Sequence, residues 1–127
     1  MELETKKGTV RSGRGDHAQW IEKLRDHYLR LTGVSLFPGT LNVEVADPWS
    51  MPAESSRLNA TDYGGRVTIL TAMCRINGLD AWVLRTEANN SGDGDHPQTI
   101  VEIASEVRLR DAFGLQDGDD VILELPV

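Results

Sequence analysis

The chain has 127 residues, 39% of them hydrophobic, and a formal net charge of −7 from 20 acidic and 13 basic residues. This length accommodates one globular domain, residues 1–127, and is too short for two. The acidic balance argues against binding to nucleic acid, because contacts with backbone phosphates require a basic face. A nucleotide ligand is not excluded, since a few arginines and a metal ion can hold its phosphates.

The N-terminus and the single cysteine indicate where the protein works. Residues 1–7 contain no apolar stretch typical of a signal peptide, and no run of the chain reaches the length of a membrane span. Cys74 lies in an apolar run, so it is predicted to be a core residue, and one cysteine excludes an internal disulfide. These features predict a cytoplasmic protein that does not bind a membrane.

The N-terminal third is expected to form a strand and the main helix. Residues 6–12 predict a strand that runs into a glycine-containing turn, and Asp16 suits the N-cap of a helix over 17–32. Gly33 suits the C-cap of this helix. Apolar residues recur at helical spacing along it, namely Trp20, Ile21, Leu24, Tyr28 and Leu31.

The middle of the chain predicts three strands. Residues 40–45 alternate apolar and polar side chains, as in a half-buried strand. Residues 46–62 contain two prolines and several small polar residues, so we expect an excursion over the surface. The stretches 66–76 and 79–86 are rich in apolar residues, and Asn77-Gly78 between them predicts a two-residue hairpin turn.

The C-terminal third predicts a loop, a strand, a short helix and a last strand. The polar stretch 87–99 is long for a loop in a small domain, which favours a functional or mobile segment, such as a lid. Strands are expected at 100–104 and 120–125, and a short helix at 108–113. The element order predicts a mainly β protein, a small barrel with one main helix and a short second helix, and not a doubly wound parallel sheet.

Three constellations can carry chemistry, and the first is the glycine turn. It comprises Ser12 and the residues Gly13, Arg14, Gly15, Asp16 and His17. Glycines let a backbone approach a ligand closely, a helix N-terminus offers N–H groups to an anion, and an arginine binds phosphate. The alternative is a strand-to-helix turn without a ligand. The chain has no G-x-x-x-x-G-K-[ST] motif, so a conventional P-loop kinase is excluded.

The second constellation consists of Thr40 and Asn42, which lie at i and i+2 of a predicted strand and so share a face. Two neutral oxygens suffice for Mg²⁺ that is carried largely by nucleotide phosphates. The third is Glu102, a carboxylate among apolar strand residues and a candidate general base, with the segment 107–110 after it. Solvent-facing strand and helix residues are the alternative for both.

Two other groups of residues look like metal ligands but have simpler explanations. Five aspartates stand near glycines, which indicates turns: Asp93, Asp95, Asp117, Asp119 and Asp120. The three histidines, His17, His27 and His96, lack the partner spacing of a zinc site.

Taken together, these segments resemble the archaeal CTP-dependent riboflavin kinases. That family reads approximately S-G-x-G-E-G before a helix, then P-x-P-G-T-L-N, later E-I-I-A-P, x-x-L-R-E and L-x-D-G-D. The matching residues occur here in the same order: 12–16, 36–42, 102–104, 109–111 and 115–119. The resemblance covers most of the chain, and Pro38-Gly39-Thr40-Leu41-Asn42 is its most specific part. It implies a six-stranded barrel of the cradle-loop (RIFT) type.

The resemblance also implies roles for particular residues. Thr40 and Asn42 would bind Mg²⁺, and Glu102 would contact the flavin side and orient or deprotonate its hydroxyl. Thr86 is the counterpart chosen for a flavin-contacting threonine of the family. Contacts with the cytidine nucleotide fall on two segments, Gly13 to His17 and the residues Val107, Arg108, Leu109 and Arg110.

The implied reaction transfers the γ-phosphoryl group of CTP to the 5′-hydroxyl of riboflavin, giving FMN and CDP, with Mg²⁺ as cofactor. The chain departs from the family at His17, at Ser105-Glu106 and in a longer loop over 88–95. These departures leave open another nucleoside triphosphate as donor, or a non-catalytic flavin- or nucleotide-binding barrel. The oligomeric state is also open, and a monomer is compatible with the sequence.

Overall fold

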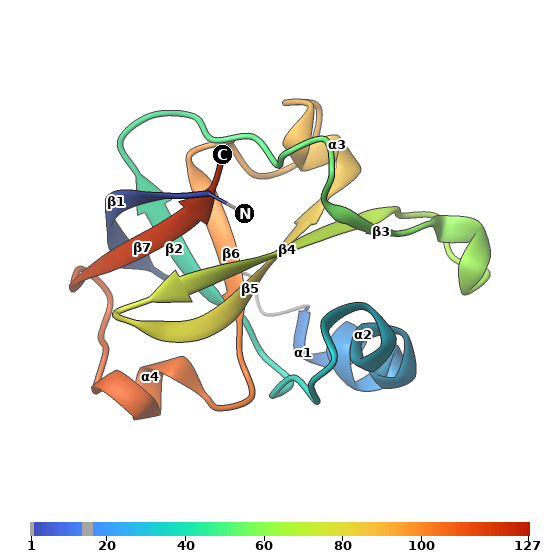
Figure 1. The fold of residues 1–127 in the computed structure, drawn as a ribbon, viewed down its shortest axis with the longest axis horizontal. Helices are drawn as coiled ribbons and strands as arrows, with labels where there is room; N and C mark the ends of the chain where they lie inside the picture. Colours follow the sequence, from blue (N-terminus) through green and yellow to red (C-terminus); the bar gives the residue numbers. More distant parts are fainter. Residues whose placement is uncertain (1, 14–16) are drawn as a thin grey trace.

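Seven strands form one antiparallel sheet in the computed structural model, which describes residues 2–13 and 17–127 (Figure 1). The sheet order is β3-β4-β5-β6-β2-β1-β7, and a further pairing of β4 with β7 closes six of the strands into a barrel. The short β3 extends β4 outside the barrel. The predicted six-stranded barrel is therefore confirmed. The strands are β1 (Leu3–Arg11), β2 (Leu41–Val45), β3 (Ser56–Leu58), β4 (Ile69–Ile76), β5 (Leu79–Thr86), β6 (Ile100–Ala104) and β7 (Asp120–Pro126).

Alternation along the strands fills the barrel with apolar side chains. On β2, Leu41, Val43 and Val45 point into the core, so the intervening residues point outward. Cys74 is also in this core, as predicted, and burial raises the pKa of its thiol to about 12. The barrel interior is thus packed and leaves the outer face for a ligand site.

The predicted helix over 17–32 is two helices, α1 (His17–Lys23) and α2 (Arg25–Thr32). Leu24 between them has φ −105° and ψ 24°, outside helical values, and its side chain is buried. Both helices pack on the outer face of the sheet, where Tyr28 contacts a second apolar cluster that includes Leu58 and Leu84. Gly33 adopts the left-handed conformation, so the predicted C-cap is confirmed.

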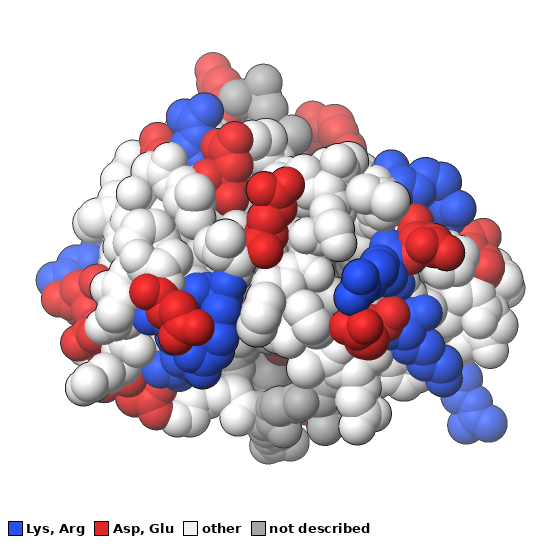
Figure 2. Space-filling model, turned by 90° about the horizontal axis from the view of Figure 1, so that it is seen from below, with Lys and Arg blue, Asp and Glu red and all other residues white. Residues whose placement is uncertain are grey.

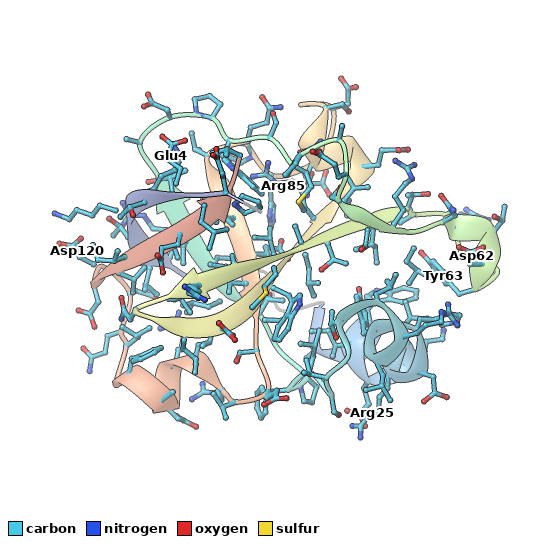
Figure 3. The ribbon with its side chains drawn as sticks, in the orientation of Figure 1. Glu4, Arg25, Asp62, Tyr63, Arg85 and Asp120 are labelled. Carbon is cyan, nitrogen blue, oxygen red and sulfur yellow. The ribbon has the colours of Figure 1, made fainter. Side chains whose placement is uncertain are left out.

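The segment 46–62 is more than a surface excursion, which corrects the sequence prediction. It contains β3 and a 3-10 helix, η1 (Ala60–Asp62), and it buries Trp49 and Met51. Arg85, labelled in Figure 3, contributes to the burial of Trp49, because its buried guanidinium lies 5.0 Å from the Trp49 ring and donates to the Trp49 carbonyl. Burial lowers the pKa of Arg85 to about 10, so it remains charged at neutral pH.

The remaining predicted strands and the short helix are confirmed, and the structure adds one short helix, α3, that was not predicted. The β4–β5 turn has positive φ at Asn77 and Gly78, as a type I′ hairpin requires. The helix predicted at 108–113 is α4 (Leu109–Phe113), which ends at Gly114. The polar stretch 87–99 begins with α3 (Glu87–Asn90). None of the helices within the described ranges is long and apolar enough to cross a bilayer.

Candidate functional site

A cavity of about 840 Å³ lies on the outer face of the barrel. Its walls come from β1, β2 and β6, from α1 and α2, from the segment after η1, from the 87–99 stretch and from α4. The fold therefore brings together segments that are widely separated in the sequence. Figure 2 shows one face of the molecule, on which Lys and Arg alternate with Asp and Glu and form no broad basic area.

Three strands place a row of polar residues along one wall of this cavity. Arg11 on β1 pairs in register with Asn42 on β2, and Asn42 pairs with Glu102 on β6. Residues opposite each other in a sheet share a face, so all three point into the cavity. Asn42 and Glu102 are each only 7% exposed. Thr40, two residues before Asn42, lines the same cavity, so the predicted pair does share a face.

The turn after β1 lies directly against Asn42. A Cβ atom on Gly13 would approach the Asn42 Nδ2 to 2.7 Å, which is closer than real Cβ contacts. Glycine is therefore required at position 13 for the turn to reach the metal-binding pair proposed below. This close approach is the physical reason for the glycine that the sequence motif contains.

The carboxylate of Glu102 has a histidine beside it. The His96 Nδ1 lies 2.9 Å from the Glu102 Oε1, and the imidazole is 20% exposed while the carboxylate is 8% exposed. Nδ1 has no hydrogen bond within the described residues, so this contact is a close electrostatic one. His96 also lines the cavity.

Arginines supply positive charge at several points of the lining, from Arg11, Arg66 and Arg110. Arg110 on α4 donates to Asp117 at 2.6 Å, and Ser12 in the glycine turn also donates to Asp117. The hydrogen bond from Ser12 has the largest effect and that from Arg110 the next, and both lower the pKa of the Asp117 carboxyl below its usual range. Asp117 thereby joins the glycine turn to α4.

Apolar side chains line the cavity as well. Trp20 on α1 is 43% exposed and Val67 is 46% exposed, and both belong to the lining. Tyr63, which follows η1, also lines the cavity (Figure 3). Exposed large apolar side chains at a cavity are typical of a ligand site. The lining therefore combines apolar side chains with the polar row on the strands.

The predicted site residues fall into two groups. Gly13, Thr40, Asn42, Thr86, Glu102 and Arg110 line the same cavity. The Thr86 hydroxyl accepts from the Asn89 backbone N–H at 3.0 Å and so caps α3. Arg14, Gly15 and Asp16 lie outside the described residues, as does the side chain of His17, whose backbone begins α1.

The four residues 107–110 do not line one cavity together. Only Arg110 of the four lines the large cavity. Val107 lines a second, smaller cavity of about 430 Å³ with Trp82 and Glu106. Arg108 pairs with Asp111 at 2.6 Å, and Leu109 is a buried core residue. The helical turn sends these four side chains in different directions.

Sequence reasoning missed several lining residues, including Trp20, Arg11, Arg66 and His96. Trp20 was assigned to the helix core, because an apolar residue at helical spacing is usually buried. Arg11 immediately precedes the glycine turn, and Arg66 follows Gly64-Gly65, so a nearby glycine was an available signal. His96 had no such signal, because its partner Glu102 is defined only by the fold.

Replacing Asp117 with asparagine is expected to lower the melting temperature at neutral pH, since Arg110 and Ser12 lose their charged partner. Asp111→Asn, which removes the other 2.6 Å arginine partner on α4, is the matched control. The lowered pKa means that charged Asp117 stabilises the fold above its usual titration range and loses this effect on acidification. Thermal melts should therefore show a wild-type advantage over Asp117→Asn that shrinks as the pH falls; a constant difference contradicts this.

The fold and the site define a small β-barrel whose larger described cavity is lined by arginines, buried polar side chains and exposed apolar side chains. The family model CTP-dep_RFKase, described as domain of unknown function DUF120, matches residues 10–125. The chain therefore belongs to the CTP-dependent riboflavin kinase family.

Curated relatives carry the same name. The chain is 30% identical over 125 residues to the riboflavin kinase of Methanocella arvoryzae, covering 94% of this chain and 56% of the relative. It is 33% identical over 131 residues to that of Pyrobaculum arsenaticum, covering 93% and 59%. It is 32% identical over 126 residues to the riboflavin kinase of Ignicoccus hospitalis, and the match covers 91% of this chain and 67% of the relative. The chain thus spans less than two thirds of the length of the first two relatives.

Proposed function

We propose that this chain is a riboflavin kinase that transfers the γ-phosphoryl group of CTP to the 5′-hydroxyl of riboflavin, giving FMN and CDP. The observation that carries the proposal is the joint placement of Thr40, Asn42 and Glu102 in one cavity beside the glycine turn. The names of the family and of the relatives support the reaction, and CTP as donor follows the family name.

The apolar and polar lining residues of the cavity match the two parts of riboflavin. Riboflavin consists of a flat, largely apolar ring and a polar ribityl chain, so the ring belongs against Trp20 and Val67. Its hydroxyl end then points toward the strand row with Glu102. The volume of about 840 Å³ lies within the usual range of ligand pockets.

Thr40 and Asn42 fit a Mg²⁺ ion. Both present neutral oxygens to the cavity, Asn42 is largely buried, and neither side chain makes a hydrogen bond to another described residue. Mg²⁺ accepts few protein oxygens when phosphates and water complete its shell. When bound there, the ion supplies charge neutralisation for the phosphates of the nucleotide.

The protein groups then act mainly by positioning and electrostatics. Glu102 orients the riboflavin hydroxyl and accepts its proton as the new O–P bond forms. The bond between the γ-phosphorus and the bridging oxygen breaks, and CDP leaves with the electron pair. Arg110 and Arg11 stabilise the negative charge of the phosphates. Holding both substrates in line contributes on the order of 7–11 kcal/mol.

The proposal assigns the whole reaction to the single barrel domain of residues 1–127, working in the cytoplasm. Riboflavin, FMN and the cytidine nucleotides are its proposed partners. Gly13 to His17 and Arg110 are the proposed nucleotide contacts, with Thr86 on the flavin side.

Replacing Trp20 with alanine is expected to raise the KM for riboflavin about tenfold, because stacking on an aromatic face contributes roughly 1–3 kcal/mol. The KM for CTP should change less than twofold. Trp82→Ala, outside the large cavity, is the control for loss of a tryptophan. Steady-state FMN formation with each substrate varied in turn measures both constants. If both KM values rise equally, the assignment of Trp20 to the riboflavin ring is wrong.

The decisive experiment incubates the purified protein with riboflavin, Mg²⁺ and CTP, ATP, GTP or UTP, and detects FMN chromatographically. We expect FMN with CTP and at least about tenfold less with the others. If FMN forms only with a different nucleoside triphosphate, that nucleotide and not CTP is the donor. Bound flavin without any FMN indicates the non-catalytic barrel and overturns the kinase assignment.

A further inference from the structure

We infer that His96 is a positioning residue that holds the Glu102 carboxylate for the phosphoryl acceptor. The inference rests on the proposed kinase activity and adds a residue that the sequence motifs do not contain. Its basis is the 2.9 Å approach of His96 Nδ1 to Glu102 Oε1 in a largely buried corner of the cavity.

The 87–99 stretch is built to deliver this imidazole. The His96 backbone N–H donates to the Asn89 side-chain oxygen at 3.2 Å, and the Asn89 backbone N–H donates to Thr86 at 3.0 Å. A Cβ on Gly94 would come within 1.8 Å of that Asn89 oxygen, so only glycine lets the loop close around Asn89. Pro97 further restricts the His96 backbone. The position of His96 is therefore fixed by its hydrogen bond to Asn89 of α3.

The chemistry follows from the position of the imidazole. A proton on Nδ1 faces Glu102 Oε1 and restricts the carboxylate to one orientation by a contact that tightens when substrate binds. A carboxylate held in this way stays directed at the riboflavin hydroxyl. Loss of the imidazole should therefore lower kcat more than it changes the KM for CTP.

Other charged or titratable groups surround the pair and stay constant in the comparison below. Arg85 and Tyr28 interact electrostatically with Glu102, and burial raises the pKa of the Tyr28 hydroxyl, so it stays neutral. The remaining ones among the described lining residues are Arg11, Tyr63, Arg66, Asp95 and Arg110. Because none of them is altered, a change in kcat on substitution of His96 reports on His96 itself.

The test compares wild type with His96→Leu, which removes the ring nitrogens, and His96→Asn, whose amide lies at the same distance from the backbone as Nδ1 and cannot titrate. His27→Gln is the control, since His27 contacts Arg30 and does not line the cavity. FMN formation gives kcat and both KM values between about pH 5.5 and 9. Circular dichroism and thermal melts verify folding of each variant.

We expect His96→Leu to lower kcat about 10- to 100-fold at about pH 8 with the KM for CTP within twofold. His96→Asn should recover kcat to within about threefold of wild type. A His96→Leu variant with wild-type kcat overturns the inference. So does a folded His96→Asn variant as impaired as His96→Leu. If wild type itself forms no FMN, the proposed function fails, and the inference fails with it.

Discussion

Replacing Asn42 with alanine is expected to lower FMN formation by at least about 10²-fold at limiting Mg²⁺, with the barrel intact. The substitution removes one of two protein oxygens proposed for the ion, and phosphoryl transfer depends on metal-held phosphates. Raising the Mg²⁺ concentration should restore part of the rate, because binding and not folding is impaired. Mg²⁺ titrations of the reaction rate measure this effect.

Two variants test the interpretation of the Asn42 result. Asn42→Asp keeps an oxygen in place and should retain more activity than alanine at equal Mg²⁺. Thr40→Val removes the other proposed oxygen while preserving shape, and should mimic Asn42→Ala. Full activity of Asn42→Ala at limiting Mg²⁺ contradicts the metal assignment.

Replacing Glu102 with glutamine is expected to reduce kcat about 10²- to 10⁴-fold, the usual contribution of a general base. Glutamine is similar in size, so the KM or dissociation constant for CTP should stay within about twofold. Rapid-quench measurement of FMN formation isolates the chemical step, and equilibrium binding of CTP measures the nucleotide site.

Glu124→Gln is the matched control for the Glu102 substitution, since it alters a carboxylate on β7 outside the cavity lining. It should leave kcat unchanged. If Glu102→Gln turns over as fast as wild type, the carboxylate is not the base. The phosphoryl acceptor would then need only positioning and electrostatic stabilisation.

Much of the local structure could be predicted because it depends on neighbours in sequence. Asn77-Gly78 specifies a hairpin turn through its positive φ angles, and Gly33 and Gly114 end helices for the same reason. The i, i+2 spacing of Thr40 and Asn42 placed both on one strand face, and both do line the cavity. Strand period alone determines this result.

Other features depended on contacts between distant segments. The break at Leu24 arises where two helices pack on a curved sheet, and periodicity along 17–32 contains no signal for it. Arg85 is buried against Trp49, although an arginine and a proline-rich stretch predict a solvated surface. Desolvation of an arginine is tolerated only where several carbonyls surround it.

The amino-acid order by itself determined the barrel strands and the common face of Thr40 and Asn42, because these follow from backbone preference and strand period. Only the tertiary structure decided which side chains share the cavity. Register across β1, β2 and β6 aligned Arg11, Asn42 and Glu102, which are tens of residues apart in the chain, so their distances are set by sheet closure. His96 is close to Glu102 in sequence, but its approach depends on how the 87–99 stretch packs around Asn89, for which no local pattern exists.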